Sequence, residues 1–163
     1  MKSEKNKESI MKKMKAAQLL FSMILVAAFF LVSLSAVSAA EYVSVAKDGV
    51  NLRSGPDTKY SVLYELPEGY PLKVEERKGQ WLKVSDFEND QGWIFTSLVS
   101  KTEYVIVTIK QGNVRSGPAI NDDKVGEVVR EVLLKKVGKQ GDWYQVEHPR
   151  LKGWIHRKLV WPR

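Results

Sequence analysis

The sequence predicts an all-β protein built from two small tandem domains, each a barrel or a sandwich, behind an N-terminal targeting segment. One pattern of residues occurs twice after residue 40, which indicates a duplicated unit of about 60 residues. Within each copy, short apolar stretches begin about every 8–12 residues and are separated by turn residues, as in small β-domains. The first forty residues combine a basic head, an apolar run and a small-residue end, which is typical of a secretory signal.

The targeting segment is expected to span residues 1–40. Its head carries six lysines against two glutamates within residues 1–15, and an apolar run follows from Leu19 to Leu34. Either Val37-Ser38-Ala39 or Ser38-Ala39-Ala40 fits a cleavage triplet. An uncleaved anchor is the alternative, although the run is slightly shorter than the roughly 20 residues that span a bilayer. Both readings place residues 41–163 outside the cytoplasm, and Met11 is a second candidate start codon.

Composition excludes several classes of function. The chain has 163 residues, a net charge of +7, no cysteine and two histidines. Residues 41–163 hold 20 basic and 17 acidic side chains, so their net charge is only +3 and gives no reason to infer nucleic-acid binding. Without cysteine there are no disulfides, thiolate metal sites or cysteine nucleophiles, and two histidines cannot form a multi-histidine zinc site.

The repeat defines two expected domains, residues 41–100 and 101–163. Its anchors recur in the same order at an offset of 62 residues, which falls to 61 after one deletion. The paired anchors are Glu41-Tyr42-Val43 with Glu103-Tyr104-Val105, Asn51-Leu52-Arg53-Ser54-Gly55-Pro56 with Asn113-Val114-Arg115-Ser116-Gly117-Pro118, Gly79-Gln80-Trp81 with Gly141-Asp142-Trp143, Gly92-Trp93-Ile94 with Gly153-Trp154-Ile155, and Leu98-Val99 with Leu159-Val160. The first copy begins at Glu41, which favours cleavage after Ala40.

Each element of the first copy can be justified in order. Residues 43–53 are expected to be extended, and 53–60 to form a loop because Gly, Pro and Asp favour turns. Short strands are expected at 62–66, around 72–74, at 81–84 and at 92–95, because apolar residues alternate with polar ones between Gly- and Asn-containing turns. In the second copy Lys136 replaces Val74, so its strand is expected to shift by one residue and bury Val137 instead.

The order Asn-apolar-Arg-Ser-Gly-Pro, Gly-x-Trp, Gly-Trp-Ile and Leu-Val resembles the bacterial SH3-like (SH3b) family over nearly all of residues 41–163. The resemblance implies two tandem partly open SH3-like β-barrels that act outside the cytoplasm. It also implies ligands such as peptidoglycan or its peptides. Unlike the wall hydrolases that carry such modules, this chain leaves no room for a catalytic domain.

The predicted ligand-binding residues are arginines and aromatic side chains. An arginine in the repeated loop either hydrogen-bonds its own loop carbonyls or faces a ligand carboxylate. Trp81 and Trp143 are equally consistent with core and groove positions, whereas Trp93 and Trp154 are expected in the core. Tyrosines clustered in the first copy would form an aromatic trough or simply cover a small barrel. The candidates are Arg53, Tyr60, Tyr64, Tyr70, Trp81, Arg115, Trp143 and Tyr144.

The second copy is predicted to carry a basic patch. Residues 41–100 have a net charge of −3 and residues 101–163 a net charge of +6. The patch is either an ordinary solvated surface or an attraction site for an anionic wall polymer, whose binding would weaken with salt. It comprises Lys135, Lys136, Lys139, Arg150, Lys152, Arg157 and Lys158.

No enzyme activity, metal or cofactor is expected. His148 and His156 lack a recognisable catalytic motif, and neither a Gly-x-Ser-x-Gly elbow nor a His-Glu-x-x-His helix is present. The sequence therefore predicts a secreted, wall-associated, non-catalytic protein that binds peptidoglycan, its peptides or an anionic wall polymer, tethered to the membrane if the signal is not cleaved. The alternative is an extracytoplasmic adaptor that binds and regulates a wall-associated protein.

Overall fold

The computed structural model describes residues 11, 13–15, 18 and 39–163, so nearly all of the predicted targeting segment lies outside the described residues. No helix among the described residues has the length and apolar character needed to cross a membrane. Residues Ala40–Arg163 form one compact unit that contains every strand of the described residues and both hydrophobic cores. This unit is therefore expected to fold without the residues that precede it.

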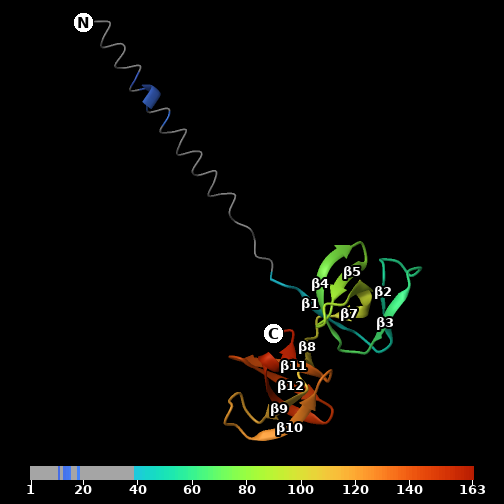
Figure 1. Ribbon diagram of the computed structural model, residues 1–163, viewed down its shortest axis with the longest axis vertical. Coiled ribbons are helices and arrows are strands. Elements are labelled where there is room, and N and C mark those ends of the chain that lie inside the picture. Colours follow the sequence, from blue (N-terminus) through green and yellow to red (C-terminus); the bar gives the residue numbers. More distant parts are fainter. Residues whose placement is uncertain (1–10, 12, 16–17, 19–38) are drawn as a thin grey trace. The chain divides into compact units, whose positions relative to one another are not determined.

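The first barrel is a seven-stranded antiparallel sheet with the strand order β3-β2-β6-β5-β4-β1-β7 (Figure 1). The 3₁₀ turn η1 (Thr96–Leu98) joins its last two strands. The strands are β1 (Tyr42–Val45), β2 (Val50–Arg53), β3 (Val62–Leu66), β4 (Pro71–Lys78), β5 (Trp81–Ser85), β6 (Gln91–Phe95) and β7 (Val99–Ser100).

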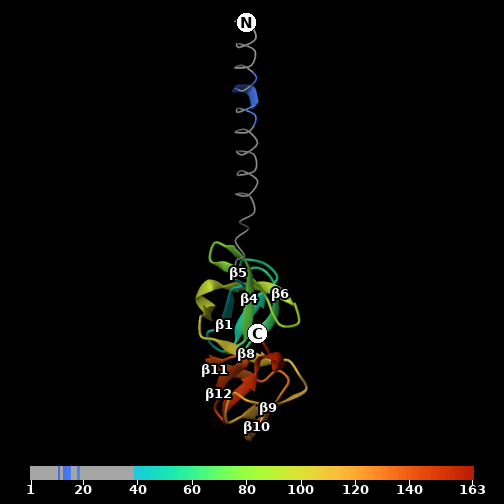
Figure 2. The same ribbon diagram turned by 90° about the vertical axis from the view of Figure 1, so that its left-hand side faces the viewer.

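The second barrel repeats this plan with the order β10-β9-β13-β12-β11-β8-β14, and Figure 2 shows the second set of strands from the side. A second 3₁₀ turn, η2 (Arg157–Leu159), occupies the place of η1. The strands are β8 (Tyr104–Val107), β9 (Gln111–Arg115), β10 (Lys124–Val129), β11 (Leu133–Gln140), β12 (Trp143–His148), β13 (Leu151–His156) and β14 (Val160–Trp161). The all-β tandem architecture predicted from the repeat is confirmed.

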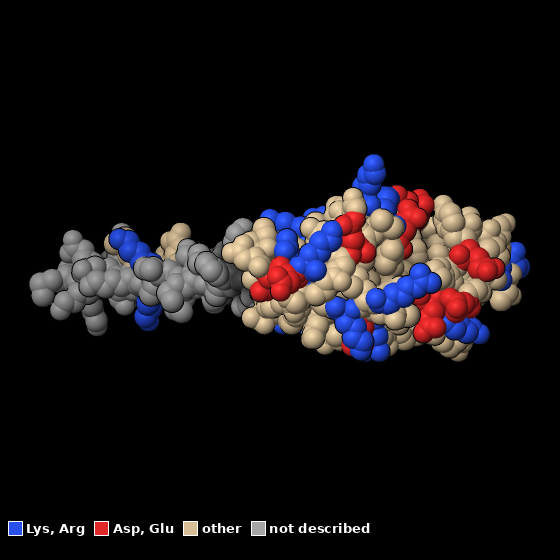
Figure 3. Space-filling model, turned by 90° about the horizontal axis from the view of Figure 1, so that it is seen from below, with Lys and Arg blue, Asp and Glu red and all other residues tan. Residues whose placement is uncertain are grey.

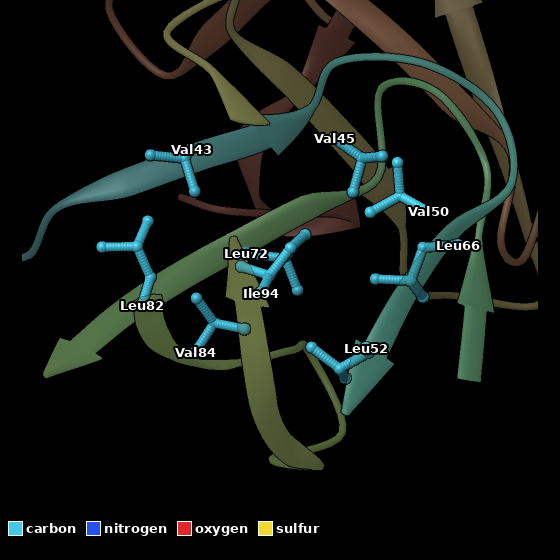
Figure 4. Close-up of a cluster of buried hydrophobic side chains, with 9 residues drawn as sticks. All are labelled: Val43, Val45, Val50, Leu52, Leu66, Leu72, Leu82, Val84 and Ile94. Carbon is cyan, nitrogen blue, oxygen red and sulfur yellow. The ribbon is translucent and has the colours of Figure 1, made fainter. Parts of the chain in front are cut away.

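Each barrel encloses its own hydrophobic core, which is aliphatic apart from Tyr144 in the second barrel. Figure 4 shows the side chains of the first core converging from β1, β2, β3, β4, β5 and β6. Leu72, Val84 and Ile94 are fully buried there, and Leu134 and Ile155 are fully buried in the second core. Nineteen hydrophobic side chains are buried among the described residues, and none of them is a tryptophan. The tryptophan side chains therefore lie outside the two buried cores.

The hairpin β4–β5 of the first barrel and the hairpin β11–β12 of the second are bulged at the same point. The register shifts between Val74 and Glu76 in the first barrel and between Lys136 and Gly138 in the second. Lys136 keeps the position of Val74, and its ammonium lies 4.6 Å from the centroid of the Tyr144 ring and 3.0 Å from Oε2 of Glu103. Val137 remains 45% exposed, so the predicted shift that would bury it is wrong. A cation–π contact and an ion pair accommodate the lysine instead.

Candidate functional site

The tryptophans lie on the outer face of each sheet. Side chains alternate between the two faces of a strand, and in β5 the buried Leu82 and Val84 face the core, so Trp81 and Lys83 face outward. In β6 the buried Ile94 likewise sends its half-buried neighbours Trp93 and Phe95 to the outer face.

The same alternation holds in the second barrel. Ile155 is buried, and Trp154 is half-buried on the opposite face of β13. The prediction that Trp93 and Trp154 belong to the core is therefore wrong, because the core positions beside them are filled by isoleucine.

A groove beside Trp81 lies on the outer face of the first barrel. It has a volume of about 360 Å³, and its lining includes Lys47, Asn51, Arg53, Trp81, Phe95 and Leu98, which we call the tryptophan groove. Trp81 and Phe95 are cross-strand partners with ring centroids 5.3 Å apart in an edge-to-face arrangement. Such a pair stabilises the wall of the groove by about 1 kcal/mol beyond the area that it buries.

The groove combines an apolar wall with polar groups at its edge. Lys47 and Arg53 supply positive charge, and the Asn51 side chain supplies an amide donor and acceptor. This composition suits a ligand that has an apolar face together with hydroxyl, amide or carboxylate groups. The structure brings together Arg53 and Trp81 from the predicted set.

The repeated arginines hydrogen-bond the carbonyl oxygens of their own loops, which is one of the two roles expected for them. Arg53 Nη1 donates hydrogen bonds to the carbonyl oxygens of Thr58 (3.0 Å) and Tyr60 (2.9 Å). Arg115 Nη1 similarly donates to the carbonyl oxygen of Asp122 at 2.8 Å. Each arginine therefore holds its own loop closed over the sheet, and the first also contributes to the groove lining. Direct ligand contact by either arginine stays a prediction.

The second barrel carries an aromatic pair at the same position, but His156 replaces Phe95 and Ile109 replaces Lys47. Trp143 pairs with His156 where the first barrel pairs Trp81 with Phe95, and the ring centroids are 5.2 Å apart. His156 Nδ1 accepts a hydrogen bond from the backbone N–H of Lys158 at 3.2 Å, which leaves Nε2 as the donor of the neutral ring. The second aromatic pair therefore adds a polar edge that the first one lacks.

The three tyrosines expected to form one trough lie in two places. Tyr64 and Tyr70 line a common cavity, whereas Tyr60 packs its ring against Gly55 in the loop after β2. Tyr144 is only 3% exposed and packs in the second core beneath Lys136. A single trough that contains Tyr60, Tyr64 and Tyr70 is therefore wrong, because the loop arginine and Gly55 hold Tyr60 apart from the other two.

Several basic residues of the second barrel are already engaged in ion pairs. Arg157 Nε donates to Asp142 Oδ1 at 2.6 Å, and this contact holds the pKa of the Asp142 carboxyl below its usual value. Lys152 pairs with Glu147 at 3.0 Å, and Lys136 pairs with Glu103. On the face shown in Figure 3, basic and acidic side chains are interspersed. Of the predicted patch, Lys135, Lys139, Arg150 and Lys158 have no ion pair among the described residues.

Sequence reasoning missed Lys47, Phe95 and His156 as parts of the outer surface. The strand Trp81-Leu82-Lys83-Val84 contained the necessary signal, because Lys83 shares a face with Trp81 and marks that face as the outer one. The next strand, Gly92-Trp93-Ile94-Phe95, contained no such signal because all of its large residues are apolar. Register with β5 is needed to orient it.

Two family profiles, both described as "Bacterial SH3 domain", match residues 46–101 and 110–160. Together with the duplicated barrel, these matches show that the chain belongs to the bacterial SH3 domain family. The matched ranges contain both aromatic pairs and both loop arginines. The fold and the surface described above are therefore those of two tandem bacterial SH3 domains.

Curated relatives share this part of their chains. A Bacillus subtilis protein named "Putative N-acetylmuramoyl-L-alanine amidase YrvJ" is 24% identical over 138 residues, which are 77% of this chain and 27% of the relative. A Staphylococcus epidermidis protein named "Probable cell wall amidase LytH" is 33% identical over 48 residues, which are 29% of this chain and 16% of the relative. The chain thus spans about a quarter or less of the length of these relatives.

Solved structures with partial similarity include an NlpC/P60 family protein from Bacillus cereus, with 14% identity and a TM-score of 0.36 over 74% of this chain and 55% of that chain. NlpC1 from Trichomonas vaginalis gives 12% identity and a TM-score of 0.34 over 79% of this chain and 48% of that chain.

Proposed function

We propose that this protein is a non-catalytic, extracytoplasmic cell-wall binding protein whose two SH3 domains attach it to peptidoglycan through their outer aromatic surfaces. The observation that carries the proposal is the duplicated aromatic pair, Trp81 with Phe95 and Trp143 with His156, on the outer faces of the two sheets. Large aromatic residues on an outer face do not serve a core. They are suited to contact with a partner.

The groove chemistry fits a wall polymer. Peptidoglycan presents sugar faces, amide groups and carboxylates, and the tryptophan groove offers an indole wall, an amide and two cations. An arginine or lysine beside an aromatic surface can pair with a carboxylate while the ring packs against the apolar part of the ligand. The names of the two relatives, both called amidases and one a cell wall amidase, favour the same class of ligand.

Each site is shallow, so single-site affinity is expected to be weak. A groove with one or two aromatic anchors gives dissociation constants of roughly 10 μM to 1 mM. Two such sites on one chain gain avidity when both reach the same polymer. Attachment to an insoluble wall therefore does not require a tight individual site.

The test is cosedimentation of residues 40–163 with purified sacculi stripped of protein, with and without teichoic acid, at low and high salt. Retention that survives both high salt and teichoic-acid removal is the expected result. Loss under either treatment would instead assign binding to the unpaired basic residues Lys135, Lys139, Arg150 and Lys158. Failure to bind stripped sacculi under any condition would contradict the proposal.

A second candidate function, a protein adaptor, is favoured by the edge strand β3. β3 pairs only with β2, and three of its apolar side chains are strongly exposed, Val62 at 48%, Leu63 at 44% and Tyr64 at 47%. An exposed apolar edge is suited to the addition of a partner's strand. This function predicts binding to an isolated wall protein in the absence of sacculi, and a charge in the strand, Leu63→Lys, would abolish that binding.

A further inference from the structure

The second aromatic pair contains a group whose charge changes between pH 5 and 8, the imidazole of His156. The ring is half-buried at the end of β13, and its centroid lies 5.2 Å from that of the Trp143 ring. Phe95 takes this position in the first barrel, where its partner is Trp81. The second pair can therefore gain a charge near neutral pH, and the first pair cannot.

The neutral imidazole has a defined task in the backbone. His156 is the N-cap of η2, and its Nδ1 accepts a hydrogen bond from the backbone N–H of Lys158 at 3.2 Å. Such a cap satisfies an N–H that the first turn of a helix leaves without an intrahelical partner. An imidazolium has an N–H donor at both nitrogens and no acceptor. Protonation of His156 and the cap of η2 therefore exclude each other.

The first barrel shows that the fold does not require this cap. Its turn η1 has Phe95 at the N-cap and no side-chain cap hydrogen bond. Thr96 attaches η1 to the sheet by donating from its backbone N–H and its Oγ1 to the carbonyl oxygen of Gln80, each at 2.9 Å. The backbone N–H of Arg157 makes the equivalent bond to the carbonyl oxygen of Asp142 at 2.9 Å. Because η1 forms without a histidine, folding does not explain His156.

Charged groups of both signs lie close to the imidazole in η2 and in the turn before β12. Arg157 and Lys158 follow His156 in η2 and disfavour a further positive charge, whereas the carboxylate of Asp142 favours one. Arg157 Nε donates to Asp142 Oδ1 at 2.6 Å. Arg157, followed by His156 and Lys158, holds the pKa of the Asp142 carboxyl below its usual value. Asp142 is therefore ionised wherever His156 titrates.

The neighbouring strands add one charged group on this face. In the row across the sheet, His156 opposes Trp143, and Trp143 in turn opposes the uncharged Gln140 of β11. From β9, Arg115 faces the same side of the sheet, because the buried Val114 beside it faces the core. The guanidinium of Arg115 is already engaged with a carbonyl oxygen of its own loop.

The turn η2 connects the imidazole to the turn between β8 and β9. At the end of η2, the carbonyl oxygen of Leu159 accepts hydrogen bonds from the backbone N–H of Thr108 at 3.0 Å and from its Oγ1 at 3.3 Å. The next residue, Ile109, occupies the position that Lys47 has in the tryptophan groove. A change at the cap of η2 can therefore reach the part of the second barrel that corresponds to the groove.

We propose that His156 is a pH-sensitive switch of the surface of the second barrel. The neutral ring caps η2. The imidazolium releases the Lys158 N–H, loosens η2 and places a positive charge beside the Trp143 ring. The aromatic pair of the first barrel stays constant over the same pH range, so the protein has one constant and one pH-dependent aromatic surface. The inference concerns the free protein and does not depend on wall attachment.

The test is an NMR titration of ¹⁵N- and ¹³C-labelled residues 40–163 between pH 5 and 8. The His156 imidazole, the Trp143 indole N–H and the Lys158 amide are expected to titrate with one common midpoint. The Lys158 amide proton is expected to move upfield as it loses its acceptor. The Ser97 amide, at the equivalent position of η1, and the Trp81 indole N–H should not shift. A Lys158 amide that does not titrate, or that titrates with another midpoint than the imidazole, would overturn the proposal.

Hydrogen exchange measures the size of the effect. Protection of the Lys158 amide should fall roughly 2- to 30-fold when His156 is protonated, the range that corresponds to the loss of one capping hydrogen bond. The Arg157 amide is the matched control, because its bond to the Asp142 carbonyl oxygen does not involve the imidazole. Equal protection of the Lys158 amide in both charge states would contradict release of the cap.

Two variants separate the switch from general effects of histidine titration. His156→Phe imports the residue of the first barrel and should abolish the Lys158 and Trp143 shifts in a folded protein. His148→Gln is the matched control, because His148 Nδ1 also accepts from the amide two residues further on, that of Arg150 at 3.3 Å. The Lys158 and Trp143 shifts should persist in this variant. A Lys158 shift that persists in His156→Phe, or is lost in His148→Gln, would rule out His156 as the switch.

Discussion

The neighbouring residues Trp81 and Leu82 allow the assignment of the outer face to be tested by stability and binding together. Leu82 is 1% exposed in the first core, and its replacement by alanine should lower the free energy of unfolding by about 2–5 kcal/mol through lost burial and a residual cavity. Trp81 is half-buried, and Trp81→Ala loses the edge-to-face contact with Phe95 and part of one ring's packing, about 1–2 kcal/mol in all. Leu82→Ala should therefore be the less stable variant, although Trp81→Ala removes the larger side chain.

The assay is thermal denaturation of residues 40–163 monitored by tryptophan fluorescence, with cosedimentation on stripped sacculi as the second measurement. For a domain of about 60 residues, 1 kcal/mol corresponds to a change in Tm of about 4–8 °C, so Leu82→Ala should melt at least about 8 °C below the parent. Trp81→Ala should melt about 4–16 °C below the parent and should lose most of its sacculus binding. If Trp81→Ala were as destabilising as Leu82→Ala and bound sacculi normally at a temperature where it is folded, the assignment of Trp81 to a binding face would be refuted.

Three further predictions concern packing and titration. Gly92→Ala should destabilise the first barrel by about 1–3 kcal/mol in thermal denaturation, because the new Cβ would lie 2.5 Å from Leu52 Cγ. Gly153→Ala should destabilise the second barrel more, because its new Cβ would lie 2.5 Å from the backbone oxygen of Arg115. Equal or raised stability of either variant would contradict this packing. Lys136→Val, which introduces the residue of the first barrel, should change the free energy of unfolding in urea by less than about 1 kcal/mol. The variant exchanges a partly exposed ion pair and a cation–π contact for apolar burial. A loss of several kcal/mol would contradict this exchange and show a larger role for the lysine. Burial beside Asp86 raises the pKa of Tyr70 in the folded state, so the contribution of the neutral Tyr70 to folding stability should be complete below pH 10 and decline as pH rises further. Absorbance titration at 295 nm should show Tyr70 ionising after the exposed tyrosines. Ionisation of all tyrosines near pH 10 would contradict the burial of Tyr70 beside Asp86.

The sequence was sufficient to predict the duplicated β-architecture, because the turn residues and alternating strands occur twice in the same order. Gly79 and Gly141 illustrate this, since both turn glycines have a positive φ, 58° and 55°, at the same point of the hairpin. The bulge that follows Lys136 could not be predicted, because a bulge changes the pairing partner without changing the pattern of apolar residues.

The candidate site was less predictable than the fold. The polar neighbour Lys83 indicates the outward position of Trp81, whereas Trp93 lies between apolar neighbours and its face depends on pairing with β5. The separation of Tyr60 from Tyr64 and Tyr70 depends on how the loop after β2 closes, which Arg53 and Gly55 decide through three-dimensional contacts. Side chains that meet through loop closure have no spacing in the sequence that would reveal them.

The measurement that tests the central claim most directly is the affinity of the aromatic double variant Trp81→Ala/Trp143→Ala for sacculi stripped of protein and teichoic acid. Glu76→Gln serves as the matched surface control, and circular dichroism at the assay temperature establishes that both variants are folded. The account predicts that the double variant loses at least about tenfold in apparent affinity at high salt, whereas Glu76→Gln binds like the parent. A folded double variant that sediments with stripped sacculi as well as the parent does would contradict wall attachment through the outer aromatic faces.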